Sequence, residues 1–165
     1  MMELDDEFIH GMLLACYDKA IESDDKKTQN GAVLWNADEN LWTRGTNKFA
    51  TELTKYPNDS GKAKWMVHAE ENAILSALTL GRQTAGSTLF CVWAPCTRCA
   101  RMIVRAGVSC LITHKSMMDR TYPKYIQEVK DGLAMLAYAG VEHINWEGEI
   151  GGGVTNLMNG ETWNP

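Results

Sequence analysis

Two spacings of hydrophobic and polar positions recur along this chain, one typical of helices and one typical of strands. Apolar residues three and four positions apart predict a helix that Asp5 and Asp6 can cap and that continues to Ala20. The same spacing predicts further helices over residues 67–80, 96–106 and 122–139. Short apolar runs predict strands over residues 31–35, 41–46, 88–93, 108–113 and 141–146. Strands that alternate with helices favour a partly parallel sheet covered on both faces.

The remaining segments are polar or rich in glycine. Residues 23–29 are expected to form a loop, and residues 48–64 a longer one, of a length that is often functional in a compact domain. The tail from about residue 147 contains Gly151, Gly152 and Gly153. It is expected to be flexible unless Trp163 pins it to a surface. With neither repeats nor a linker, a single domain over residues 1–165 is expected.

Size and charge narrow the classes of function. The 165 residues suit one domain with one core. The formal net charge of −5 weakens the case for long DNA or RNA as a partner, because nucleic-acid binders usually carry a basic face. A small ligand is therefore favoured. No apolar run approaches the roughly 18 residues of a membrane span, and the acidic start lacks the basic region of a signal peptide.

The cysteines indicate the redox environment. There are five, an odd number, in a chain without a recognisable secretion signal. This favours a reducing cytoplasm, where cysteines are thiols or metal ligands rather than disulfides.

Two short motifs place metal-binding residues at the starts of predicted helices. One is His68-Ala69-Glu70, and the other is Pro95-Cys96-Thr97-Arg98-Cys99. Thiols at a helix N-terminus ionise readily, and zinc takes thiolate and imidazole ligands in tetrahedral geometry. His68, Cys96 and Cys99 would fill three positions and leave the fourth open to water, which is the catalytic pattern. Glu70 could then move protons without binding the metal.

Each motif alone has a simpler interpretation. A single Cys-x-x-Cys pair is also typical of a redox pair or of half a structural zinc site. A structural site would need a fourth donor, for which Cys91, Cys110 and His114 are candidates. The two cysteines lie in apolar strands, where a buried thiol is common, and His10 and His143 are expected to be ordinary helix and strand residues. Together and in this order, the two motifs favour a catalytic zinc site, because they form the pattern of zinc deaminases.

Longer stretches around these motifs resemble the deoxycytidylate (dCMP) deaminase family, part of the cytidine deaminase-like superfamily. The similar segments are SDDKKTQNGAVL (23–34), RGTNKFA (44–50), WMVHAEENAI (65–74) and APCTRCARMIVRAGV (94–108). The resemblance extends roughly over residues 5–146. It implies an α/β fold, namely a three-layer α-β-α sandwich with a five-stranded mixed sheet.

The resemblance also implies a reaction and its catalytic residues. One zinc ion would be held by His68, Cys96 and Cys99, and water activated there would attack C4 of the cytosine. Glu70 would take a proton from that water, deliver it to N3 and help ammonia to leave. The product of dCMP would be dUMP, the precursor of thymidylate, and dCTP is a further candidate substrate.

Further residues are implied for the substrate pocket. These are Asn47, Ala69, Trp93, Ala94, Pro95 and Tyr122. Asn47 would bind the sugar or the base edge, and the backbone of Ala69 would contact the pyrimidine. The ring that covers the base is left open, because Met118 stands near the position where the family often has a tyrosine, and Tyr122 and Tyr125 follow it.

The same resemblance implies a homohexamer that is activated by dCTP and inhibited by dTTP, with an effector site near residues 45–48. The family loop usually reads Gly-Tyr-Asn-Gly, whereas this chain reads Gly-Thr-Asn-Lys there. Lys48, Arg120 and Lys124 flank the expected pocket and are candidates for phosphate or effector contacts. Residues 48–67 contain neither cysteine nor histidine, so no second zinc ion is expected in that loop.

Three other functions are alternatives. A deaminase acting on cytosine or adenine in nucleic acid would need a basic groove and stacking aromatic residues. A deaminase of free nucleosides would turn over deoxycytidine faster than dCMP. A non-enzymatic zinc-binding module would leave Glu70 idle and would close the metal with a fourth ligand.

Overall fold

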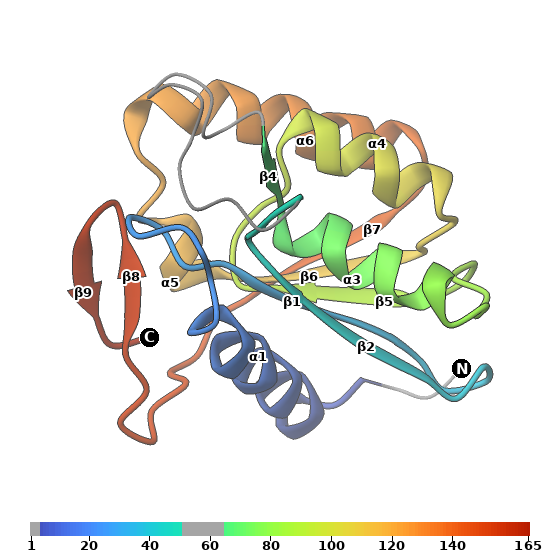
Figure 1. Ribbon diagram of the computed structural model, residues 1–165, viewed down its shortest axis with the longest axis horizontal. Coiled ribbons are helices and arrows are strands. Elements are labelled where there is room, and N and C mark those ends of the chain that lie inside the picture. The colour runs from blue at the N-terminus through green and yellow to red at the C-terminus, as the bar shows by residue number, and fades with distance from the viewer. Residues whose placement is uncertain (1–3, 51–64) are drawn as a thin grey trace.

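The computed structural model describes residues 4–50 and 65–165, and it places a five-stranded sheet between two layers of helices (Figure 1). The strands are β1 (Gly31–Asn36), β2 (Leu41–Thr46), β5 (Thr88–Cys91), β6 (Cys110–His114) and β7 (Glu142–Trp146). Their order across the sheet is β2-β1-β5-β6-β7. β1 runs antiparallel to β2 and β5, whereas β5, β6 and β7 are parallel to one another. The predicted mixed sheet is therefore confirmed.

One face of the sheet is covered by α1 (Asp6–Ala20). The helix begins where predicted, because the Asp5 carboxylate accepts a hydrogen bond from the Phe8 backbone N–H at 2.8 Å. Its inner face buries Ile9, Met12, Leu13, Cys16, Tyr17 and Ala20. This face packs on Val33, Phe90 and Ile112, which come from three neighbouring strands. The removal of this apolar surface from water holds α1 on the sheet.

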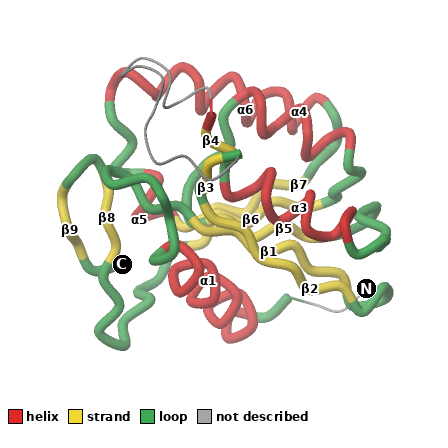
Figure 2. Tube along the Cα trace, in the orientation of Figure 1, coloured by secondary structure: helices red, strands yellow, loops and turns green. Residues whose placement is uncertain are grey.

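The opposite face is covered by α3 (Ala69–Thr79), α4 (Thr97–Arg105) and α6 (Ile126–Tyr138). Each helix contributes a fully buried side chain to a second core cluster, for example Ala73, Ile103 and Leu136. Figure 2 shows that α4 and α6 lie side by side, and α3 lies over the β1–β2 side of the sheet. The three-layer α-β-α arrangement expected from the family resemblance is present.

Two glycines allow close approaches that bring the helix starts together. A side chain at position 45 would collide with the carbonyl of Ala69, so Gly45 lets β2 lie against the start of α3. A side chain at position 132 would collide with the carbonyl of Pro95, so Gly132 lets α6 lie against the segment that leads into α4. Both glycines therefore shape the region where the two predicted metal-binding motifs begin.

The ends of some predicted elements were wrong because short elements intervene. The helix expected from residue 67 begins at Ala69, since β4 (Met66–Val67) pairs with β3 (Lys48–Phe49) just before it. The helix expected from residue 122 begins at Ile126, after a 3-10 turn, η1 (Pro123–Tyr125). The short helix α5 (Lys115–Met118) was not predicted at all.

The glycine-rich tail is ordered, which corrects the expectation that it is flexible. Strands β8 (Asn156–Met158) and β9 (Glu161–Trp163) form a hairpin whose turn is Asn159-Gly160. Both turn residues have positive φ angles, 56° and 87°, as a two-residue hairpin turn requires. Trp163 is only 8% exposed and packs against the rings of Tyr17 and His114. The alternative interpretation, that Trp163 pins the tail, is the correct one.

Most of the long loop predicted over residues 48–64 lies outside the described residues, which omit 51–64. The expectation that it is functional and holds no second zinc ion therefore stays a prediction. Among the helices in the described part of the chain, none is long and apolar enough to cross a membrane.

Candidate active site and metal centre

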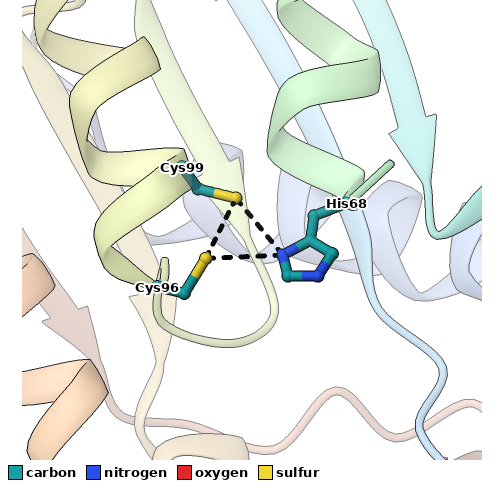
Figure 3. Close-up of side chains that lie close together, drawn as sticks. All are labelled: His68, Cys96 and Cys99. Atoms are coloured by element: carbon teal, nitrogen blue, oxygen red, sulfur yellow. Dashed lines mark hydrogen bonds between the residues drawn. The ribbon is translucent and has the colours of Figure 1, made fainter. Parts of the chain in front are cut away.

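Three side chains that could together hold a metal ion converge where the starts of α3 and α4 meet (Figure 3). His68 is the N-cap residue of α3, Cys96 is the N-cap residue of α4, and Cys99 lies in the first turn of α4. The Nδ1 atom of His68 is 3.5 Å from the sulfur of Cys96 and 3.4 Å from that of Cys99. The two sulfurs are 3.6 Å apart. The two motifs are thus brought to one point, as the sequence predicts.

These distances fit one tetrahedral zinc ion. Zinc–sulfur bonds of about 2.3 Å and zinc–nitrogen bonds of about 2.0 Å place two tetrahedral sulfurs about 3.8 Å apart, and a sulfur and a nitrogen about 3.5 Å apart. The described residues offer no fourth donor from the candidates named above. His114 uses both ring nitrogens, facing the Tyr17 hydroxyl at 2.7 Å and the Gly148 carbonyl at 2.9 Å. Cys91 and Cys110 are buried strand residues outside the cluster.

The charge state of the thiols also favours a cation here. The hydrogen bond between the Cys96 and Cys99 sulfurs outweighs the effect of burial and, with a second contact from His68, lowers the pKa of Cys96 to about 3. The proximity of the Cys96 thiolate, together with burial, raises the pKa of Cys99 far above its ordinary value. Burial and the short distance between the sulfurs thus disfavour two thiolates that have no counter-charge. A divalent cation would allow both thiols to ionise.

Glu70 lies beside this cluster and is almost completely buried, with 1% of its surface exposed. Burial raises the pKa of its carboxyl to about 7, although the nearby His68 ring acts in the opposite direction. A carboxyl of this kind can both take and release a proton near neutral pH. Glu70 is not one of the three clustered donors, in agreement with the role predicted for it.

An ion pair that the sequence reasoning missed joins the two motifs. The Glu71 carboxylate accepts a hydrogen bond from the His68 backbone N–H at 3.0 Å and from the Arg98 guanidinium at 2.6 Å. Arg98 also donates to the Met66 carbonyl at 2.8 Å. The pair fixes the start of α3 relative to the start of α4. It thereby also fixes the relative positions of His68, Cys96 and Cys99. A signal was available, because Glu71 is the third residue after an N-cap position and Arg98 lies between the two cysteines.

A cavity of about 650 Å³ opens over the donor cluster. Among the residues predicted for the substrate, its lining contains Asn47, Trp93, Ala94, Tyr122 and Lys124. Asn47 accepts a hydrogen bond from the Ala69 backbone N–H at 3.1 Å, so these two predicted residues contact each other. Pro95 is buried, and its carbonyl faces Gly132. The lining also includes Asn30, which the sequence reasoning did not single out.

Three aromatic rings stand at the cavity, and Met118 is not among its lining residues. Trp93 donates its indole N–H to the Thr121 hydroxyl at 2.8 Å, and its ring meets that of Tyr125 edge to face at 6.0 Å. Tyr122 and Tyr125 both line the cavity and are 53% and 40% exposed. Of the three residues considered for covering a base, the two tyrosines line the cavity and Met118 does not.

The three predicted phosphate or effector residues lie in different places. Lys124 lines the cavity, and Lys27, which was not predicted, lines it as well. Lys48 pairs with Asp24 at 3.0 Å and is not in the lining. Arg120 lies 4.2 Å over the ring of Trp163, also outside the cavity. Two lysines, one of them predicted, are therefore available to an anionic group in the cavity.

The C-terminal hairpin reaches the same cavity, which the sequence reasoning did not anticipate. Asn159 lines the cavity, and its backbone N–H donates to the Thr28 hydroxyl at 3.2 Å. Gly160 donates to the Lys27 carbonyl at 2.7 Å. Figure 2 shows the hairpin beside the loop that follows α1. The available signal was the Asn-Gly dipeptide, a strong marker of a hairpin turn.

Comparison with known sequences gives a family match and two relatives. The profile described as "cytidine and deoxycytidylate deaminase zinc-binding region" matches residues 2–115. A probable deoxycytidylate deaminase of Drosophila melanogaster is 30% identical over 119 residues, covering 64% of this chain and 56% of that protein. The deoxycytidylate deaminase of Enterobacteria phage T2 is 31% identical over 81 residues, covering 49% and 42%. The chain thus spans about half the length of these curated relatives.

Solved structures share the fold. The dCMP deaminase from cyanophage S-TIM5, in complex with dCMP and dUMP, superposes with a TM-score of 0.72 at 22% identity, covering 87% of this chain and 100% of that one. A Thermotoga maritima diaminohydroxyphosphoribosylaminopyrimidine deaminase/reductase has a TM-score of 0.55 at 21% identity, covering 82% and 36%. At these identities the likeness concerns the fold, and it agrees with the three-layer arrangement expected from the sequence.

Proposed function

Because the chain belongs to the cytidine and deoxycytidylate deaminase family, we propose that it is a zinc-dependent enzyme that converts dCMP and water to dUMP and ammonia. The observation that carries the proposal is the convergence of His68, Cys96 and Cys99 beside the buried carboxyl of Glu70, at the floor of a cavity. The names of the two curated relatives support dCMP as the substrate. The proposal treats residues 1–165 as one catalytic domain that acts in the cytoplasm.

His68, Cys96 and Cys99 would hold one zinc ion, and Glu70 would move the protons. Zinc, when bound, supplies Lewis acidity that makes water a competent nucleophile near neutral pH. The Glu70 carboxylate takes a proton from the attacking water and delivers it to N3 of the pyrimidine. Glu70 then takes the second proton from the hydroxyl now on C4 and passes it to the departing amine as the C4–N4 bond breaks, so that ammonia leaves and the C4 oxygen becomes the carbonyl of dUMP. Its pKa of about 7 suits both directions of transfer.

The cavity walls would bind the rest of the nucleotide. Trp93 and Ala94, with buried Pro95 behind them, would form one wall, and Tyr122 or Tyr125 would cover the base. Asn47, held by the Ala69 backbone, would meet the sugar or the base edge. Lys124, together with Lys27, would attract the 5′-phosphate, because both line the cavity and carry positive charge.

The regulatory part of the proposal depends on the family resemblance. It comprises activation by dCTP, inhibition by dTTP, a homohexamer and the supply of dUMP for thymidylate synthesis. Near the expected effector loop, Lys48 is paired with Asp24, and Gly45 is packed against α3. An effector phosphate at Lys48 would therefore have to compete with the carboxylate of Asp24.

The test is ammonia release from cytosine, cytidine, deoxycytidine, CMP, dCMP and dCTP, with and without dCTP or dTTP as effectors. We expect the highest kcat/KM for dCMP, and loss of turnover when a chelator removes the metal. Faster turnover of free nucleosides than of dCMP would overturn the nucleotide assignment. Cys96→Ser should lose zinc, measured by metal analysis, whereas Cys110→Ala should keep it.

A further inference from the structure

The catalytic carboxyl has a neighbour that belongs to neither metal-binding motif. Asn30 immediately precedes β1, is 4% exposed and lines the cavity. Its side-chain Nδ2 lies 3.4 Å from Oε2 of Glu70. This contact is long for a hydrogen bond, but contacts of this kind often tighten when a substrate binds. The amide therefore stands where it can hold one oxygen of Glu70.

A second contact decides which way the Asn30 amide points. The thiol of Cys91, on the adjacent strand β5, donates to Oδ1 of Asn30 at 3.5 Å. Burial raises the pKa of Cys91, so the group stays a thiol and keeps its proton. With Oδ1 facing a donor, the NH₂ group must face Glu70. The reversed amide would place an acceptor against the Glu70 carboxylate.

The backbone around Asn30 is also held in place. The Asn30 carbonyl accepts a hydrogen bond from the Thr46 hydroxyl at 2.7 Å, and the next carbonyl, that of Gly31, accepts one from the Val92 N–H at 3.2 Å. Contacts to β2 and to the end of β5 thus fix the position of the amide. Asn30 is therefore anchored before the substrate arrives, as preorganisation requires.

We propose that Asn30 is a positioning residue for Glu70, and that Cys91 orients it. The amide holds Oε2 and so orients the carboxyl for proton exchange with the substrate. The chain Cys91–Asn30–Glu70 is thus a built support for the proton-transfer group. This inference rests on the deamination proposed above, because its effect on rate is measured as turnover of dCMP.

The kinetic test separates positioning from substrate binding. Asn30→Ala should lower kcat at least about tenfold while KM changes little, because the lost contact acts on proton transfer. Asn30→Asp, which has the same shape, should lower kcat further, since it faces Glu70 with a second negative charge. Zinc content should stay at the wild-type level in both variants. A raised KM with unchanged kcat would overturn the proposal, since Asn30 would then bind the substrate.

The Cys91 variants test the orienting contact. Cys91→Ser keeps a donor and should retain several-fold more kcat than Cys91→Ala, which has none. Cys110→Ala, the matched control on strand β6, should leave kcat unchanged. Equal kcat values for Cys91→Ser and Cys91→Ala would show that the thiol does not orient Asn30.

A spectroscopic readout works even if dCMP is not the substrate. The Asn30 side-chain NH₂ resonances, assigned by their absence from the NMR spectrum of Asn30→Ala, should shift in Glu70→Gln and in Cys91→Ala. If the wild-type protein turns over no substrate, the proposed function is refuted. The change in the Asn30 resonances would still show whether the Asn30 amide contacts Glu70. Unchanged resonances in Glu70→Gln would refute the positioning role.

Discussion

Glu70 owes its proposed proton-carrying role to burial. The carboxyl is nearly excluded from water, which disfavours its charged form and moves its pKa to about 7. Glu70→Gln keeps the shape of the side chain but removes the exchangeable proton. We expect kcat for dCMP to fall by roughly 10²- to 10⁴-fold, with zinc content and thermal midpoint nearly unchanged. Ammonia release and metal analysis measure both quantities, and a wild-type kcat would remove Glu70 from the mechanism.

His114, at the end of β6, is expected to make the free energy of unfolding depend on pH. Burial lowers the pKa of its ring, and the hydrogen bond to the Gly148 carbonyl offsets only part of this effect. In the unfolded chain the pKa returns to its ordinary value of 6.5. As the pH falls below that value, the unfolded state binds a proton that the folded state does not, so the free energy of unfolding decreases. Above that value the ring is neutral in both states and contributes no pH dependence.

Denaturant unfolding between pH 7 and pH 5 measures this effect. Glu70 works in the opposite direction, because its raised pKa lets the folded state take up a proton over the same range. The effect of His114 is therefore the difference between two proteins: from pH 7 to pH 5 the free energy of unfolding should fall more, or rise less, in the wild type than in His114→Gln, whose side chain does not titrate. His143 adds to the wild-type slope, since burial lowers its pKa as well. Identical slopes for the wild type and His114→Gln would show that His114 is not the source.

At the level of elements, the metal site depends on how α3 and α4 are held together. Glu71 accepts hydrogen bonds both from the His68 backbone and from Arg98, which lies between the two cysteines. Glu71→Gln removes the charge that holds Arg98, so the donors lose part of their preorganisation. We expect zinc affinity to fall by about 10- to 100-fold, as for other partners of metal ligands. Competition with a chelator measures the affinity.

A matched control is available at the end of α1. Glu22, just after the helix, also pairs with a basic side chain, that of Lys19 at 2.6 Å, but the pair is exposed and includes none of the three clustered donors. Glu22→Gln should leave zinc affinity at the wild-type value. If both variants bind zinc equally well, the Glu71–Arg98 pair does not support the site.

The sequence predicted the positions of the main helices and strands because they depend on local spacing. The buried run of β1 and the first three residues of β6, for example, are apolar, so their burial is visible without a structure, whereas the burial of Thr113 and His114 is not. The clustered ligands were predicted because their motifs are short. The contacts that support them join distant residues, 40 positions apart for Asn30 and Glu70 and 27 for Glu71 and Arg98. Local spacing marks Glu71 as a capping residue of α3, but it does not show that Glu71 pairs with Arg98, and it gives no sign of the contact between Asn30 and Glu70.

At the scale of the whole molecule, the C-terminal hairpin lies beyond residues 2–115 matched by the family profile, yet it reaches the cavity. Its anchor is Trp163, which packs on His114 and Tyr17 while Arg120 lies over its outer face. The turn residue Asn159 is held against Thr28, on the loop that lines the same cavity. The hairpin thus connects the packing of Trp163 in the core to the lining of the cavity.

Trp163→Ala tests this coupling. Loss of the buried ring should lower the free energy of unfolding by about 3–5 kcal/mol, measured by denaturant titration. Because Asn159 and the Thr28 loop lose their support, KM for dCMP should rise more than kcat falls. Trp42→Ala is the matched control, since the Trp42 ring is 55% exposed on the edge strand β2 and should affect both quantities little. A destabilised Trp163→Ala protein with an unchanged KM would show that the hairpin stabilises the fold without shaping the cavity.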